Sequence, residues 1–116
     1  MIFGYLRTSI GGRRFQDEVR ALESFGVLRV VVDQGIAQNS RFQERDSMLK
    51  SLAQGDTVVV THTSHLADDP RKLSELVGII HWRGASFRSL SEYIDTATPA
   101  GRLILHVLST GDDFDA

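Results

Sequence analysis

A hydroxyl and a guanidinium stand close together near the amino terminus, at Ser9 and Arg7. The stretch that leads to them, residues 2–9, begins with an apolar run containing Phe3 and Tyr5, which is typical of a buried strand. Ligands of open α/β sheets usually bind at the carboxyl ends of the strands. A serine beside an arginine there supplies a nucleophile and a cation that binds phosphate, the minimum that nucleophilic attack on a phosphate needs. The alternative for Ser9 is a simple turn former or helix N-cap.

A second group of reactive residue types follows a predicted strand over residues 57–61. The sequence of residues 62–69 is HTSHLADD, and it places His62, His65, Asp68 and Asp69 at close spacing. These are metal-ligand types, but a His-x-x-His pair at a strand end lacks the frame of a known metal site. Asp69 precedes Pro70 and is better explained as a helix N-cap.

The elements that must position these residues alternate between helices and strands. A first helix is indicated by apolar residues at helical spacing, and Gly26 is its predicted C-cap: Phe15, Val19, Leu22 and Phe25. Residues 28–32 form a β-branched run that predicts a strand buried on both faces. This strand ends at Asp33, which is either a site residue at the sheet edge or a turn former before Gly35.

Further along the chain the same alternation continues. A second helix is predicted over Phe42–Gln54, closed by Gly55, with an inner face of Met48, Leu49, Leu52 and Ala53. A third helix starts at Pro70, a fourth strand covers residues 85–90, and Thr98 with Pro99 begins a last helix. The fold class is therefore α/β, with a largely parallel central sheet of four to five strands and helices on both faces.

Composition limits the remaining possibilities. The 116 residues suffice for one domain, and the proportions of apolar residues (41%) and charged residues (24%) are ordinary for a globular protein. The absence of cysteine excludes disulfides and thiolate chemistry, and no cofactor is expected. No apolar run approaches membrane-spanning length, so we expect a cytoplasmic protein without membrane contact. A net charge of −2 predicts that this chain alone binds DNA weakly.

Two segments of the sequence resemble one protein family. GYLRTS followed by FQDEVRAL is similar to the opening of the resolvase and invertase type of serine recombinase, and residues 87–109 resemble the segment leading into that family's long dimer helix. The resemblance implies site-specific DNA recombination: strand cleavage and exchange through a phosphoserine intermediate. It also implies that Ser9 is the nucleophile, that Arg7 stabilises the phosphate, and that Tyr5 and Asp33 belong to the same site.

The chain departs from the family in the segment that follows the third strand. Where the family has an Asp-Arg-Leu-x-Arg signature, this sequence has Ser64 in place of the aspartate, with His65 and Asp68 in place of the two arginines. Arginines offset the negative charge of a phosphoryl-transfer transition state, so activity is expected to be impaired. A protonated His65 or the nearby Arg71 could compensate only in part. Glu18 stands where many members have glutamine.

The resemblance also sets expectations for organisation and partners. Residues 1–116 are expected to form a single catalytic domain that lacks the family's long dimer helix and its helix-turn-helix DNA-binding domain. Partners are then DNA, bound weakly or through a partner subunit, and recombinase subunits in a homo- or hetero-oligomer.

Three functions remain open from the sequence. The first is an enzyme that still cleaves DNA through Ser9. The second is a non-catalytic interaction module that pairs with a full-length recombinase or another protein through the apolar face of its last helix. The third is a small α/β module that binds a phosphorylated metabolite at the Ser9 edge. A Ser9-dependent covalent adduct with DNA distinguishes the first from the others.

Overall fold

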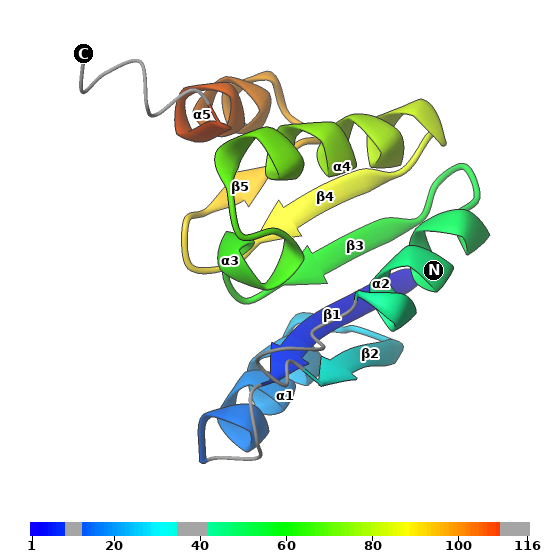
Figure 1. Cartoon of the computed structure of the whole chain (residues 1–116), viewed down its shortest axis with the longest axis vertical. Helices are drawn as coiled ribbons and strands as arrows, with labels where there is room; N and C mark the ends of the chain where they lie inside the picture. The colour runs from blue at the N-terminus through cyan, green and yellow to red at the C-terminus, as the bar shows by residue number, and fades with distance from the viewer. Residues whose placement is uncertain (9–12, 35–41, 110–116) are drawn as a thin grey trace.

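A five-stranded sheet forms the centre of the molecule (Figure 1). The computed structural model describes residues 1–8, 13–34 and 42–109. The strands lie in the order β2-β1-β3-β4-β5, with β1 to β4 parallel and β5 antiparallel to β4. Their bounds are β1 Ile2–Thr8, β2 Arg29–Gln34, β3 Thr57–Val60, β4 Ser86–Ser89 and β5 Ile94–Asp95. This architecture confirms the predicted α/β fold.

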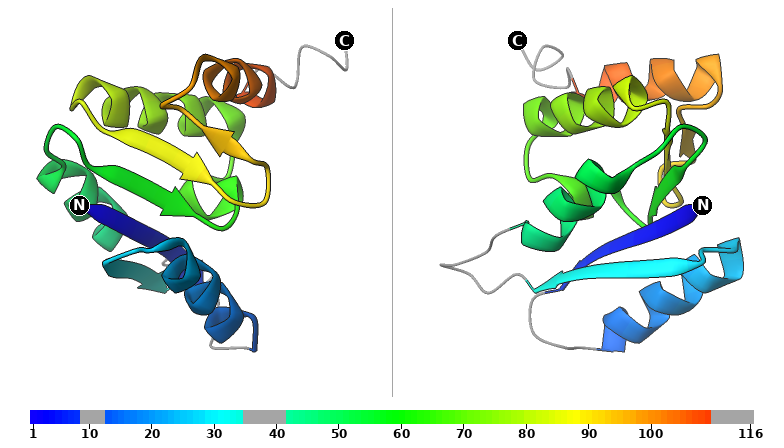
Figure 2. Two further views of the ribbon diagram at one scale, coloured as in Figure 1. Left: turned by 180° about the vertical axis from the view of Figure 1, so that it is seen from behind. Right: turned by 90° about the vertical axis from the view of Figure 1, so that its right-hand side faces the viewer.

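Helices cover both faces of the sheet, as predicted (Figure 2). On one face, α1 (Arg13–Phe25) buries Leu22 in an apolar cluster with Leu6 of β1 and Val59 of β3. On the other face, α2 (Gln43–Ser51) and α4 (Pro70–Trp82) pack over a larger core that includes Phe3, Tyr5 and Phe87 of the strands. Alternate residues of each strand therefore supply the two cores, which is the periodicity of a strand covered on both sides.

Several predicted helix ends are confirmed. Gly26 follows α1 with a φ of 106°, a backbone conformation that favours glycine. The side chain of Asp69 accepts a hydrogen bond from the backbone N–H of Lys72 at 2.9 Å, so it is the N-cap of α4. Thr98 likewise accepts from the N–H of Gly101 at 3.0 Å, at the start of α5 (Pro99–Ser109).

The prediction that the second strand is buried on both faces is wrong. β2 lies at the edge of the sheet and pairs with β1 alone, and its three central valines are only half-buried. Leu28, which precedes it, is 74% exposed. A run of β-branched residues does not distinguish an edge strand from a central one, because both present the same side chains to the helices above.

The second helix is shorter than predicted, because it ends at Ser51 rather than Gln54. The carboxylate of Asp56 accepts the backbone N–H of Ala53 at 2.8 Å, which closes a turn in place of further helix. Ala53 is consequently exposed rather than on the inner face. Two elements were not predicted at all, the two-residue strand β5 and the one-turn helix α3 (Thr63–Leu66).

The last helix lies close against the sheet at a single small residue. A Cβ atom on Gly101 would sit 1.9 Å from the carbonyl oxygen of Asp95 in β5, so only glycine fits at this point of contact. The last residue of α4, Trp82, is an aromatic side chain that is 89% exposed to solvent. Within the described residues, no helix is long and apolar enough to cross a membrane.

Candidate functional site

The carboxyl ends of three parallel strands meet at one edge of the sheet and bring the predicted residues together. Arg7, near the end of β1, lies in register beside Asp33 at the end of β2. The segment after β3 forms α3, which packs against β1 on its other side. Tyr5, Arg7 and Asp33 therefore lie together at this edge, while Ser9 lies outside the described residues.

Asp33 is the buried centre of this edge, with only 4% of its surface exposed. One carboxylate oxygen accepts the hydroxyl of Tyr5 at 2.7 Å and the backbone N–H of Arg45 at 2.8 Å. The other accepts the N–H of Glu44, also at 2.8 Å. Asp33 thus satisfies two of the free N–H groups at the start of α2, where the helix dipole favours a negative charge. Its observed role is to join β1, β2 and α2.

The phenol of Tyr5 is fully buried beside that carboxylate. Burial, and then the hydrogen bond to Asp33, raise the pKa of Tyr5 well above its ordinary value. The phenol therefore stays protonated and donates its hydrogen to Asp33 throughout the physiological range. In this arrangement Tyr5 holds the position of Asp33.

Arg7 has a guanidinium that is only partly satisfied. Its Nη1 donates to the Oδ1 of Asp68 at 3.2 Å, and its guanidinium carbon lies 4.3 Å from the centre of the Phe42 ring. Its Nε is buried and has no hydrogen-bond partner among the described residues. A buried N–H of a charged group without an acceptor costs free energy, so the Arg7 guanidinium is incompletely satisfied in this arrangement.

A second arginine at this edge was not predicted. Arg45 of α2 is 4% exposed, and its guanidinium carbon lies 3.8 Å from the ring centre of the same Phe42. It donates to the carbonyl of Leu66 at 2.8 Å and to the carboxylate of Asp46 at 3.0 Å. Arg45 therefore holds the end of α3 against the start of α2. Helical spacing could have located it, because Arg45 is one turn before Met48 on the inner face.

His65 of α3 forms a hydrogen bond through each of its ring nitrogens, one to β1 and one to α1. Its Nδ1 accepts the backbone N–H of Arg7 at 3.1 Å, and its Nε2 lies 2.7 Å from the Oε1 of Glu18. An imidazole nitrogen that accepts a hydrogen bond carries no proton, so this geometry assigns the neutral form with its hydrogen on Nε2. These hydrogen bonds fit the neutral tautomer and do not support the compensation by a protonated His65 that was considered from the sequence.

His62 has the same form one turn earlier. Its Nδ1 accepts from the backbone N–H and the hydroxyl of Ser64, at 3.1 and 2.9 Å, and caps α3. Its Nε2 lies 3.3 Å from Glu92, in the turn before β5, which also accepts from the hydroxyls of Ser89 and Thr63. Each histidine is thus engaged with a different carboxylate. Among the described residues, no group of three or more histidine, cysteine, aspartate or glutamate side chains is placed to hold a metal ion.

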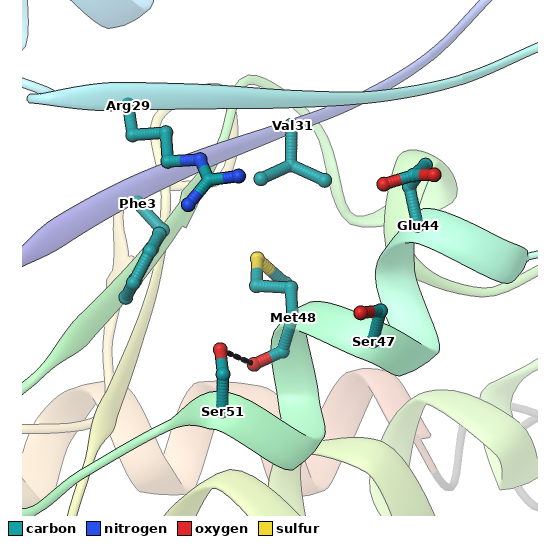
Figure 3. A pocket seen from close by; sticks show the side chains of 7 residues that line it. All are labelled: Phe3, Arg29, Val31, Glu44, Ser47, Met48 and Ser51. Carbon is teal, nitrogen blue, oxygen red and sulfur yellow. Dashed lines mark hydrogen bonds between the residues drawn. The ribbon is translucent and has the colours of Figure 1, made fainter.

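A pocket of about 140 Å³ lies beside this region, between α2 and strands β1 and β2 (Figure 3). Its lining mixes Arg29 and Glu44 with serines and apolar side chains, and Arg29 extends its guanidinium between Phe3 and Val31 (Figure 3). Neither Tyr5, Arg7 nor Asp33 lines it. The chemistry suggested by the sequence therefore lies at the strand ends and not in this pocket.

Comparisons with known proteins agree with this architecture. The family described as "Resolvase, N terminal domain" matches residues 2–116. The DNA-invertase of Escherichia phage P1 is 35% identical over 108 residues, and the DNA-invertase hin of Salmonella typhimurium is 32% identical over 106 residues. These matches cover 93% and 91% of this chain but only 58% and 56% of the two relatives. The chain thus spans little more than half the length of the relatives it matches.

Solved structures give the same result in three dimensions. The N-terminal catalytic domain of TP901-1 integrase superposes with a TM-score of 0.71 at 26% identity, covering 98% of this chain and 95% of that domain. A resolvase family site-specific recombinase from Streptococcus pneumoniae gives the same TM-score at 16% identity, covering 98% of this chain and 86% of that one. The latter likeness concerns the fold alone.

Proposed function

Because this chain belongs to the resolvase N-terminal domain family, we propose that it is a serine recombinase catalytic domain that acts in site-specific DNA recombination. Ser9 is the nucleophile of this proposal, and Arg7 binds the phosphate that Ser9 attacks. Tyr5 and Asp33 position the strand ends that carry them.

The proposed reaction uses two groups of this chain, the hydroxyl of Ser9 and the guanidinium of Arg7. The hydroxyl oxygen of Ser9 bonds to the phosphorus of a DNA phosphodiester and loses its proton, while the bond to the 3′ oxygen breaks and that oxygen leaves as a hydroxyl. The transition state gathers negative charge on the phosphate oxygens. Arg7 offsets part of this charge through its guanidinium N–H groups, which match the geometry of a phosphate.

The observation that carries this proposal is the buried Nε of Arg7 without an acceptor. It belongs to a guanidinium that is held against the Phe42 ring at the carboxyl end of β1, two residues before Ser9. A phosphate at the exposed part of this guanidinium, whose side chain is 19% exposed, adds acceptors to a cation that is incompletely hydrogen-bonded.

The same geometry supports a slow reaction. His65 is neutral in its observed hydrogen bonds, and Asp68 brings a negative charge to Arg7. By analogy with arginine fingers, the loss of one such cation slows phosphoryl transfer by about a thousandfold or more. We therefore propose an impaired enzyme that acts together with DNA and other recombinase subunits, in the cytoplasm.

A covalent-adduct assay tests the proposal. The protein, and separately Ser9→Ala, is incubated with end-labelled DNA carrying recombinase sites, with and without a full-length relative, and denatured before electrophoresis. We expect a faint adduct with the natural sequence and none with Ser9→Ala. Ser51→Ala is the matched control, because it removes a hydroxyl of α2 that bonds to Met48.

The second candidate function is a non-catalytic module that pairs with a recombinase subunit. The ion pair between Arg7 and Asp68 favours it, because a carboxylate already pairs with the guanidinium that would bind the phosphate. Equal results for the natural sequence and Ser9→Ala, both without adduct, would favour this function. Co-purification of the chain with the full-length relative then measures the pairing directly.

A further inference from the structure

We propose that Asp68 is an internal competitor for the DNA phosphate, so that its charge sets how strongly Arg7 binds an oxyanion. This inference rests on the proposed function, because it concerns the same guanidinium. It goes beyond the loss of an arginine at position 68, since the residue present acts against the ligand rather than merely failing to help it.

The contact itself shows the competition. The Oδ1 of Asp68 lies 3.2 Å from the Nη1 of Arg7, at the separation of a hydrogen-bonded ion pair. The carboxylate is the group that most resembles a phosphate in charge and acceptor geometry. Asp68 therefore occupies one side of the guanidinium, while the Nε remains without an acceptor.

The exposed carboxylate of Asp68 contributes little to the packing of the described residues. The side chain of Asp68 is 68% exposed, whereas that of Arg7 is 19% exposed. The only hydrogen bond recorded for the Asp68 side chain among the described residues is the one to Arg7. Its neighbour Asp69, by contrast, caps α4 and cannot be removed without cost to that helix. Substitution of Asp68 should therefore change charge without changing the fold.

The expected size follows from the distance and the exposure. For a phosphate on the exposed part of the Arg7 guanidinium at about 5 Å from Asp68, each unit of like charge weakens binding about fourfold in water-like surroundings. Asp68→Asn keeps the shape and the acceptor oxygen but removes this charge. We expect phosphate affinity to rise by about fourfold or more.

Nuclear magnetic resonance measures this at the atom concerned. Inorganic phosphate is titrated at constant ionic strength while the side-chain Nε–H signal of Arg7 is followed, assigned by its loss in Arg7→Lys. The natural sequence is compared with Asp68→Asn and Asp68→Ala. Asp17→Asn is the matched control, because it removes the same charge from an exposed position of α1, where Asp17 pairs with Arg20 at 3.7 Å.

The inference is supported if both Asp68 variants tighten phosphate binding at Arg7 about fourfold while Asp17→Asn changes it less than twofold. Equal changes in the Asp68 and Asp17 variants would show a general effect of net charge and would overturn it. Unchanged affinity in the Asp68 variants overturns it as well. If phosphate still shifts the Arg7 signal in the natural sequence, that last result leaves the proposed function intact, since Ser9 chemistry is measured separately by the adduct.

Discussion

Two aspartates flank the arginine-bearing strand and differ in almost every physical respect. Asp33 is 4% exposed and accepts three hydrogen bonds, from a phenol and two helix N–H groups. The side chain of Asp68 is 68% exposed, and within the described residues its hydrogen-bond partner is Arg7. The comparison separates two uses of one side chain. Asp33 maintains the structure of the sheet edge, and Asp68 changes its charge.

Substitution of Asp33 should have the largest effect on this comparison. Asp33→Ala leaves the Tyr5 hydroxyl and the Arg45 N–H buried without an acceptor and removes the acceptor of the part-buried Glu44 N–H, so we expect a loss of about 4 kcal/mol in the free energy of unfolding. Asp68→Ala should change it by less than about 0.5 kcal/mol, as for an exposed ion pair. Urea unfolding followed by far-ultraviolet circular dichroism measures both. Similar losses in the two variants would remove the distinction.

Tyr5→Phe sharpens the same comparison from the other side of the hydrogen bond. We expect a loss of about 1 kcal/mol at neutral pH, because Asp33 loses one of its three donors. The pKa of Tyr5 is raised in the folded protein, so its contribution is complete below the unfolded pKa of about 10 and declines as the pH rises above it.

The loss of folding stability at high pH can be compared with the effect of the chain's second tyrosine, Tyr93. Stability of the natural sequence should fall more steeply above about pH 10 than that of Tyr5→Phe. Tyr93→Phe should retain the steep decline, because Tyr93 is 88% exposed. Parallel alkaline curves for the natural sequence and Tyr5→Phe would contradict the structural role of the Tyr5 phenol.

The partner of His65 tests whether this histidine adds a positive charge to the edge. Glu18→Gln should keep the hydrogen bond to Nε2 and the neutral form of His65, with a change in stability of about 0.5 kcal/mol or less. Nitrogen chemical shifts of the imidazole report the protonation state directly. Spectra at neutral pH that show both nitrogens protonated would overturn this assignment and return a positive charge to the site.

Asp56 extends the comparison to a third carboxylate and gives the smallest expected effect. The backbone N–H of Ala53 and then the amino-terminal ammonium hold the pKa of Asp56 below its ordinary value. Its contribution to stability is therefore present above the unfolded pKa of about 3.9 and is lost as the pH falls toward the lower folded value. The stability difference between the natural sequence and Asp56→Asn should be small at pH 6 and vanish in strong acid, as acid titrations would show.

The sequence allowed the fold to be predicted because its helices carry strong local signals. The apolar spacing of Leu73, Leu76 and Ile80 and the caps at Asp69 and Thr98 all act within one or two turns. β5 and α3 are too short for any periodicity. The site was predictable only in part, because the pairing of Arg7 with Asp68 joins residues 61 positions apart.

The same dependence on contacts between distant residues explains why the role of Arg45 was not predicted. Helical spacing places Arg45 on the inner face of α2, but its acceptor is the backbone carbonyl of Leu66, which no local pattern reveals. The neutral form of His65 was equally hidden, because it depends on an N–H from β1 and a carboxylate from α1.

The exposed position of Trp82 determines how these experiments can be read. It is the chain's single tryptophan, and a ring that is already in water when the protein is folded changes its surroundings little on unfolding. Intrinsic fluorescence would therefore show an almost flat trace through a complete transition. For the same reason, a molecule that binds over the end of α4 and shields Trp82 from water should change the tryptophan fluorescence.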